Sequence, residues 1–334
     1  MKILRYILFP IVPIYYLVTW LRNKLYDLGI KTSKSYNLPV ICVGNLSVGG
    51  TGKTPMIEYL IRLLKDKHHI ATLSRGYKRH TKGFVVADAS ATVATIGDEP
   101  FQFYKKFDDV IVAVDANRQH GIESLMAFDH QLDVVLLDDA YQHRKVKAGF
   151  YILLTAYNDL YVNDIMLPTG NLREPKSGAN RASIIVVTKC PINIGVAEKQ
   201  SIMDALKIKP HQEVFFSSII YSESIRNASG KKDLDYLKDK KLTLVTGIAN
   251  STPLIDYLKS KDLNFEHLNF DDHYEFNRKD ISILKEKEFI LTTEKDFMRL
   301  ETHFKGDDKL FYLPIEMQID DSDAFDKRIT NLVI

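Results

Sequence analysis

A glycine-rich segment between an apolar run and an amphipathic run constrains this chain more than any other feature of its sequence. Residues 47–54 read Ser-Val-Gly-Gly-Thr-Gly-Lys-Thr and follow the strand-like run Val40–Val43. The next stretch, Met56–Lys65, is amphipathic and predicts a helix. A strand, a glycine loop and a helix in this order are the context of a phosphate-binding P-loop. The alternative is a glycine-rich turn that carries a Lys-Thr pair by chance.

Each part of this loop has a chemical role in that prediction. Glycines let successive N–H groups point at phosphate oxygens, and the helix amino terminus adds its dipole. Lys53 is expected to contact the β- and γ-phosphates as a catalytic residue, and the Thr54 hydroxyl is expected to bind Mg²⁺. The predicted nucleotide-binding residues are Ser47, Val48, Gly49, Gly50, Thr51, Gly52, Lys53 and Thr54.

Two consecutive acids support the nucleotide site. Asp138 and Asp139 follow the apolar run Val134–Leu137. In P-loop folds a strand of the same sheet delivers an aspartate to the Mg²⁺ shell, so both acids are candidate metal ligands. Without the P-loop, two capping or loop acids would be an equal explanation.

The sequence favours ATP over GTP. GTPases read guanine with an Asn/Thr-Lys-x-Asp segment at the end of a strand. Residues 188–191 follow such a run and read Thr-Lys-Cys-Pro, so Pro191 stands in the aspartate position. The guanine reader is therefore missing, and the expected cofactors are ATP and Mg²⁺.

Strand-like apolar runs alternate with helix-like stretches through most of the chain. Such alternation predicts an α/β fold with a mainly parallel, P-loop NTPase-like sheet and helices on both faces. The pattern loosens over residues 191–240, and a second α/β run starts at Leu242–Thr246. We expect an N-terminal membrane-interface helix over residues 1–28, a P-loop kinase core over 29–205 and a smaller C-terminal α/β lobe over 206–334. The predicted strands of the core are Val40–Val43, Ile70–Ser74, Val110–Val114, Val134–Leu137, Tyr151–Leu154 and Ile184–Val187.

The amino terminus contains an uncharged run, Tyr6–Leu21, with basic residues on both sides. A transmembrane helix needs ~20 apolar residues, and this run is short and contains Pro10 and Pro13. A cleaved signal peptide needs small residues at its cleavage site, whereas this run ends in bulky and basic residues. Its aromatic side chains and basic flanks are typical of a helix that lies in the membrane interface, and the alternative is a helix packed on the protein's own core. The flanking basic residues are Lys2, Arg5, Arg22 and Lys24.

The remaining composition excludes several classes of protein. The formal net charge is +2, so no strong field points to nucleic acid. The two cysteines, Cys42 and Cys190, lie in apolar strand-like runs, which indicates buried free thiols in a reducing compartment rather than a disulfide. No feature of the sequence indicates an obligate protein partner.

Further acids, a histidine and several basic residues lie where strands end or helices begin. Asp98 and Glu99 begin a helix-like segment, where they either complement the helix dipole or face the phosphates. His273 follows a strand of the second lobe; a lone loop histidine is more often structural, but a carboxylate–histidine pair could take a proton from a hydroxyl. Arginines at the carboxyl ends of parallel strands suit phosphate, with surface ion pairs as the alternative. These basic candidates are Arg75, Arg118, Arg144 with its neighbour His143, and Arg173.

Taken together, these motifs resemble the tetraacyldisaccharide 4′-kinase (lipid A 4′-kinase) family. They occur in the order of that family and cover nearly the whole chain, and the serine at position 47 is shared with it. One departure is Ala140-Tyr141 after the paired acids, where the family usually has Gly-Phe; only the fine placement of the turn depends on it. The matching segments are Gly44–Pro55, Ser74–Tyr77, Gly97–Pro100, Asp138–Asp139 with Gln142–His143, Gly170–Pro175 and Phe270–His273.

The resemblance implies transfer of the ATP γ-phosphate to the 4′-hydroxyl of a tetraacylated glucosamine disaccharide 1-phosphate. It implies a peripheral or monotopic enzyme on the cytoplasmic face of the inner membrane, with the lipid-linked disaccharide and the membrane surface as partners. By the same resemblance, Asp98 and His273 form the base pair, and Glu99 serves Mg²⁺ together with the paired acids. It also implies a nucleotide or substrate site lined by Asn45, Arg75, Tyr77, Arg118, His143 and Arg173.

Two other functions compete with this interpretation. A membrane-associated P-loop ATPase switch would hydrolyse ATP to control a protein partner and would need no hydroxyl acceptor. A small-molecule kinase would use the same core, and its N-terminal helix would only pack on the protein.

Overall fold

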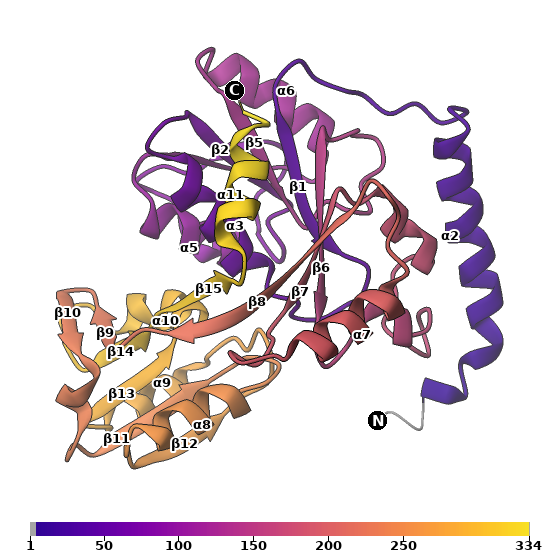
Figure 1. The fold of residues 1–334 in the computed structure, drawn as a ribbon. Coiled ribbons are helices and arrows are strands. Elements are labelled where there is room, and N and C mark those ends of the chain that lie inside the picture. The colour runs from indigo at the N-terminus through magenta and orange to yellow at the C-terminus, as the bar shows by residue number, and fades with distance from the viewer. Residues whose placement is uncertain (1–4, 334) are drawn as a thin grey trace.

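The computed structural model describes residues 5–333 and contains two β-sheets with helices packed on them (Figure 1). Residues 1–4 of the predicted N-terminal helix, Lys2 among them, lie outside the described part of the chain. The larger sheet carries the glycine-rich loop, and the smaller sheet forms a separate lobe below it in the view of Figure 1.

The larger sheet has nine strands within the described residues. They are β1 (Val40–Asn45), β2 (Ile70–Ser74), β3 (Val85–Val86), β4 (Val110–Val114), β5 (Val134–Asp138), β6 (Phe150–Ala156), β7 (Ile184–Thr188), β8 (Glu213–Tyr221) and β15 (Ile315–Ile319). Their order is β15-β8-β7-β6-β1-β5-β2-β4-β3, and only the edge strands β15 and β3 run antiparallel to their neighbours. The predicted mainly parallel sheet is therefore confirmed, with β1 at its centre.

Helices cover both faces of this sheet, as the alternating pattern predicted. Ile41 and Val43 of β1 pack on one face, in a core shared with α3 (Lys53–Leu64), α5 (Asp98–Lys106) and α11 (Ser322–Thr330). The alternate residues of β1 point to the opposite face, which is covered by α6 (Arg118–Phe128), and α7 (Val196–Leu206) covers that side over β6 and β7. A strand buried on both faces reads as a continuous apolar run, which is why these strands could be found from the sequence.

The second lobe has a six-stranded mixed sheet in the described residues. Its strands are β9 (Ser224–Asn227), β10 (Gly230–Asp233), β11 (Leu242–Thr246), β12 (Phe265–Asn269), β13 (Phe289–Thr293) and β14 (Leu310–Leu313), in the order β10-β9-β14-β13-β11-β12. Its helices are α8 (Thr252–Ser260), α9 (Arg278–Lys285) and α10 (Glu294–Leu300). The lobe also contains the short η4 (Leu234–Leu237) and η5 (Glu301–His303), and the larger domain contains the short α4 (Val93–Ile96), η2 (Tyr161–Asn163) and η3 (Lys176–Arg181).

The two sheets divide the chain differently from the expected boundary between residues 205 and 206. Strands β8 and β15 and helix α11 belong with the larger sheet, so the smaller sheet takes only residues 224–313. The chain therefore passes from one sheet to the other twice, after β8 and before β15. The apolar run of β8 was hidden in the region where the alternation loosens, and β15 is a half-exposed edge strand with a weak sequence signal.

The N-terminal helix α2 (Val12–Asp27), preceded by the short η1 (Phe9–Ile11), lies along the side of the larger sheet (Figure 1). Val12 and Tyr15 pack against the core, and the Asn23 side chain donates to Glu174 Oε2 at 2.7 Å. The other face leaves a set of large apolar side chains in solvent. These are Ile14, Tyr16, Leu17, Val18, Trp20 and Leu21. Over residues 5–333, no helix has the length and apolar character needed to cross a bilayer.

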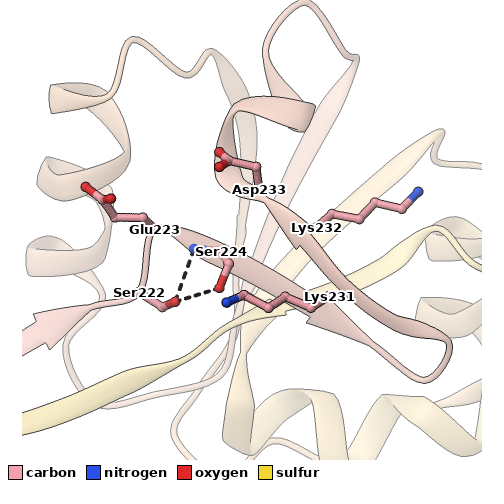
Figure 2. Close-up of a pocket in the computed structure, with 6 residues that line it drawn as sticks. All are labelled: Ser222, Glu223, Ser224, Lys231, Lys232 and Asp233. Atoms are coloured by element: carbon pink, nitrogen blue, oxygen red, sulfur yellow. Dashed lines mark hydrogen bonds between the residues drawn. The ribbon is translucent and has the colours of Figure 1, made fainter.

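A cavity of about 400 Å³ lies in the second lobe, beside the turn between β8 and β9 and the start of the β10 hairpin. Figure 2 shows that its lining carries side chains of both charges, and none of them belongs to the predicted site. The lining residues are Ser222, Glu223, Ser224, Lys231, Lys232 and Asp233.

Candidate active site

The glycine-rich loop connects the end of β1 to the first turn of α3. Gly49 has φ +118° and Gly52 has φ +86°, which are conformations that side chains with a Cβ rarely adopt. The helix begins at Lys53, three residues earlier than predicted, so Lys53 and Thr54 both stand in its first turn. This geometry leaves the amino end of α3 facing the loop, which is the arrangement that binds phosphate.

Lys53 lies in a network with four other predicted site residues. Its ammonium group is 3.5 Å from Asp139 Oδ1 and 3.4 Å from Asn45 Oδ1. The Arg173 guanidinium donates to both carboxylate oxygens of Asp139, at 3.2 and 3.1 Å, and to Asn45 Oδ1 at 3.0 Å. Arg173 also donates to the Ser47 carbonyl at 3.3 Å. The structure thus brings Lys53, one of the paired acids and two candidate substrate residues together.

The paired acids have opposite electrostatic environments. Burial, the neighbouring carboxylate of Asp139 and the charge of Glu99 raise the pKa of Asp138 to about 7. Burial opposes ionisation of Asp139 as well, but Lys53 and Arg173 outweigh it and lower the pKa of Asp139.

Several buried polar atoms around this loop have no protein partner. They are Asn45 Nδ2, Thr51 Oγ1 and Asp138 Oδ1. Buried polar groups are normally satisfied, so three unpartnered atoms on residues in and beside the loop fit a site built to receive phosphate and a cation. Within residues 5–333, no three His, Cys, Asp or Glu side chains gather into a metal-binding cluster of their own. A Mg²⁺ ion bound with a nucleotide takes most of its ligands from phosphates and water.

Asp98 and His273 contact each other across the two lobes. Asp98 is the first residue of α5, and its Oδ2 lies 3.1 Å from His273 Nδ1. His273 has a left-handed backbone with φ +58° in the loop after β12, and its N–H donates to the Gly247 carbonyl at 3.2 Å. The Tyr77 ring stands edge-on to the imidazole, with 5.8 Å between ring centroids. Residues 175 positions apart in the sequence therefore meet in one cluster.

Two cations of α10 complete this cluster, and the sequence analysis missed both. Arg299 donates to Asp98 Oδ2 through Nε at 3.1 Å and through a closer Nη2, and Lys295 Nζ lies 2.7 Å from Glu99 Oε1. Burial opposes ionisation of Asp98, but hydrogen bonds from His273 and Arg299 lower its pKa. Burial likewise opposes ionisation of Glu99, and Lys295 lowers its pKa.

The remaining basic candidates surround the paired acids at different depths. Arg118 is buried and donates to backbone carbonyls, including that of Asp115 at 2.9 Å. Burial lowers the pKa of Arg118, the paired acids oppose that change, and the charge of Arg75 adds to it. Arg75 is exposed after β2. Burial, followed by the charge of Arg118, lowers the pKa of His143 to about 4, so this imidazole is neutral at neutral pH.

The Thr-Lys segment after β7 supports the P-loop without an aspartate for guanine. Thr188 Oγ1 donates to the Thr51 carbonyl at 2.8 Å, and Lys189 Nζ donates to the Gly50 carbonyl at 2.5 Å. Pro191, which follows, is exposed and offers no acceptor side chain. Both cysteines are free and buried, as expected.

With this geometry established, comparison with known proteins identifies the family. A model of the tetraacyldisaccharide-1-P 4′-kinase family matches residues 4–334. A tetraacyldisaccharide 4′-kinase of Flavobacterium johnsoniae is 54% identical over 319 residues, which cover 95% of this chain and 93% of that protein. The chain belongs to this family.

Other members of the kinase family agree with the assignment. A tetraacyldisaccharide 4′-kinase of Bacteroides thetaiotaomicron is 44% identical over 351 residues, covering 98% of this chain and 92% of the relative. The solved structure of an LpxK from Aquifex aeolicus in complex with ATP has a TM-score of 0.80 and 30% identity, and the match covers 99% of this chain and 100% of that one. The protein is thus a kinase of lipid A biosynthesis with the P-loop kinase fold, as the motifs predicted, and the ATPase switch is not favoured.

Proposed function

We propose that this kinase transfers the γ-phosphate of ATP to the 4′-hydroxyl of a tetraacyl glucosamine disaccharide 1-phosphate, with catalytic groups from both lobes. The observation that carries the proposal is the contact between Asp98 of the larger domain and His273 of the smaller lobe. This contact is joined to the P-loop helix, because Asp98 begins α5 and the Gln102 side chain of α5 donates to Glu58 Oε1 of α3 at 2.8 Å. Phosphoryl transfer depends on positioning, charge stabilisation and a base, and this cluster supplies a group for each.

In the proposed reaction, His273 is the base and Asp98 orients it. Asp98 accepts a hydrogen bond from His273 Nδ1, which leaves the Nε2 lone pair to take the proton of the 4′-hydroxyl. The hydroxyl oxygen forms a bond to the γ-phosphorus as the bond from that phosphorus to the β–γ bridging oxygen breaks. The products are the 4′-phosphorylated lipid and ADP, with the proton on the imidazole. The Asp98 carboxylate stabilises the resulting imidazolium.

The P-loop binds and orients the donor in this proposal. Lys53 leaves Asp139 or shares it with the phosphates, where its charge offsets the negative charge on the transferring group. Arg173, which also donates to Asn45, keeps Asp139 in place beside Lys53. Arg75, Tyr77, Arg118 and His143 line the region that receives the sugar phosphates and the nucleotide.

The donor set of the site fits Mg²⁺. Thr54, Glu99, Asp138 and Asp139 supply hydroxyl and carboxylate oxygens, the ligands that this hard cation prefers. Asp138 Oδ1 has no protein partner, and a nearby cation would favour the ionised form of that buried carboxylate. When bound, Mg²⁺ would offset charge on the β- and γ-phosphate oxygens.

The membrane interface is the proposed place of the reaction. The substrate's acyl chains keep it in a bilayer, so the enzyme must meet it there. The exposed apolar face of α2, with Leu17 59% and Trp20 40% exposed, supports an anchor that lies in the interface. The same helix docks on the core through Tyr15 and Asn23, which places the membrane beside the catalytic domain. We propose the cytoplasmic face of the inner membrane, where ATP is available.

The test is transfer of label from ATP to lipid. The kinase is incubated with Mg²⁺, ATP labelled in the γ-phosphate and the tetraacyl disaccharide 1-phosphate in mixed micelles. We expect labelled lipid and ADP in equal amounts, and no labelling of a matched acceptor that lacks the 4′-hydroxyl. Release of inorganic phosphate at the same rate with and without lipid would instead identify an ATPase switch and refute the proposal.

A further inference from the structure

Helices α5 and α10 pack against each other, and charged contacts join them. Arg299 and Lys295 of α10 contact Asp98 and Glu99 in the first turn of α5. Lys106, the last residue of α5, lies 2.8 Å from Glu294 Oε1 of α10. The apolar faces between these contacts pack together through Phe101 of α5 and the buried side of α10. The smaller lobe therefore holds the helix that begins with the proposed catalytic acid.

Arg299 is itself fixed by the second lobe. Its Nη1 donates to Asp296 Oδ1 at 2.9 Å, and Asp296 is fully buried. The Asp296 carboxylate also accepts from the Gly247 N–H at 2.9 Å and from Thr293 Oγ1 at 2.7 Å. The Gly247 carbonyl in turn accepts from the His273 N–H. The backbone of Gly247 therefore contacts His273 directly and Arg299 through Asp296. A guanidinium held in this way presents a preorganised donor to Asp98.

A side chain at position 247 could not be accommodated in this arrangement. A Cβ there would lie 2.9 Å from Asp296 Oδ1. The close approach of the Gly247 backbone to the carboxylate is thus part of how the second lobe fixes Arg299. The order of contacts runs from the Gly247 backbone through Asp296 and Arg299 to Asp98.

Lys295 favours one tautomer of His273. Its ammonium group lies 3.2 Å from His273 Nε2, and an ammonium can only donate. His273 Nδ1 lies 3.1 Å from Asp98 Oδ2, an acceptor, and 3.2 Å from Arg299 Nη2, a donor that also contacts Asp98. A hydrogen on Nε2 would point at the Lys295 ammonium, whereas a hydrogen on Nδ1 satisfies both Asp98 and Lys295. This is the tautomer that a base acting through Nε2 requires. Lys295 occupies the position at Nε2 that a substrate hydroxyl would take, and Glu99 is its second partner.

We propose that Arg299 and Lys295 are positioning residues for phosphoryl transfer: Arg299 fixes the Asp98–His273 pair, and Lys295 selects the Nε2-accepting tautomer while holding Glu99. The proposal rests on the proposed role of Asp98 and His273. On arrival of the acceptor, Lys295 gives up its contact with Nε2 and keeps its contact with Glu99. Neither cation needs to touch ATP, so their loss should affect turnover more than ATP binding.

The experiment compares kcat and KM for Arg299→Gln, Arg299→Lys and Lys295→Gln in the full-length kinase with lipid and Mg-ATP. Displacement of a catalytic group by about 1 Å costs about a hundredfold in rate, so we expect kcat to fall by about tenfold to a hundredfold. KM for ATP should change by less than about threefold, because uniform binding is retained. Arg299→Lys should restore little activity, since a single ammonium cannot contact Asp98 and Asp296 together.

Matched controls separate positioning from general loss of charge or stability. Arg328→Gln removes an arginine paired with Glu213 at 2.9 Å, and Lys287→Gln removes a lysine paired with Glu266 at 2.7 Å, both away from the site. These variants should keep normal kcat. Thermal unfolding of every variant identifies any that fail to fold. If Arg299→Gln fails to fold, the test rests on Lys295→Gln, because the Lys295 side chain is more exposed than that of Arg299.

A double-mutant cycle gives the decisive result. In the His273→Ala background, Arg299→Gln should cost less than about twofold in kcat, because it acts through the Asp98–His273 pair. Lys295→Gln should cost less there than it does with His273 present, because only its contact with Glu99 remains. Folded variants with unchanged kcat, or losses that are as large without His273 as with it, would overturn this proposal alone. Normal turnover of His273→Ala would overturn the proposed function and this inference together.

Discussion

Replacing Asp138 by asparagine should stabilise the nucleotide-free kinase while removing its phosphoryl transfer. Asp138 is buried at the end of β5, and burial together with Asp139 and Glu99 raises its pKa to about 7 from an ordinary value of 3.8. Asparagine has nearly the same shape and never ionises. The variant therefore isolates the cost of placing a negative charge at this buried position.

The free-energy cost of the buried Asp138 charge follows from the linkage between proton binding and folding. The folded protein keeps the Asp138 proton up to about pH 7, whereas the unfolded chain loses it near 3.8. Because the folded state binds more protons in this window, stability falls as pH rises from about 4 to about 7 and is constant above it. Three pH units at about 1.4 kcal/mol each give a penalty of about 4 kcal/mol at pH 8. About 2 kcal/mol of this develops between pH 5.5 and pH 8.

Urea unfolding of both proteins at pH 5.5 and pH 8, without nucleotide and with a chelator, measures this penalty. We expect the stability advantage of Asp138→Asn to be larger at pH 8 than at pH 5.5 by about 2 kcal/mol. The pKa of Glu294 is also raised to about 7, by burial and by Glu58, but it contributes equally to both proteins and cancels. An advantage that does not change with pH, or a variant that is less stable at pH 8, would refute the electrostatic reasoning.

Two further perturbations test the donor site and the anchor. Lys53→Ala should lower kcat by about a hundredfold or more, because it removes the ammonium charge that stabilises the transferring phosphoryl group. The unfolding midpoint should stay nearly unchanged. Near-normal turnover of the folded variant would contradict the P-loop assignment. The pair Leu17→Ser and Trp20→Ser should weaken binding to anionic vesicles by at least about tenfold, since a large apolar side chain contributes about 1.5–3 kcal/mol when buried. Phe128→Ser on α6, which is 60% exposed, is the matched control and should bind vesicles as the wild type does. Equal binding of all three proteins would exclude α2 as the anchor.

The central sheet could be predicted because its physical signal is local. Strands such as Ile70–Ser74 and Val110–Val114 are buried on both faces, so each is a continuous apolar run with the predicted bounds. Strand β8 was missed because Ser217 and Ser218 interrupt its apolar run, and α11 because only Phe325 and Ile329 of its residues are buried. Membership of a short element in one sheet or another depends on long-range pairing, which the sequence pattern does not carry.

The site residues, like the strands, could be predicted only where the signal is local in the sequence. The P-loop residues and the paired acids are adjacent in sequence to their own strands, so their meeting at one sheet edge follows from the fold. Asp98 and His273 could be paired only through the family resemblance. Lys295 and Arg299, four residues apart on a helix with Asp296 between them, have the spacing of an ordinary solvated helix face. Only the packing of α10 on α5 shows that these cations point at the acids of the other lobe.

The central claim is that Asp98 and His273, one from each lobe, act as a unit on the substrate hydroxyl. The direct measurement is kcat for Asp98→Ala, His273→Ala and the double variant, with lipid and Mg-ATP at saturation and with ATP affinity measured alongside. We predict that each single substitution lowers kcat strongly, that the double variant loses little more than the worse single one, and that ATP affinity changes much less than kcat. Losses that multiply independently, or unchanged turnover of His273→Ala, would contradict the account.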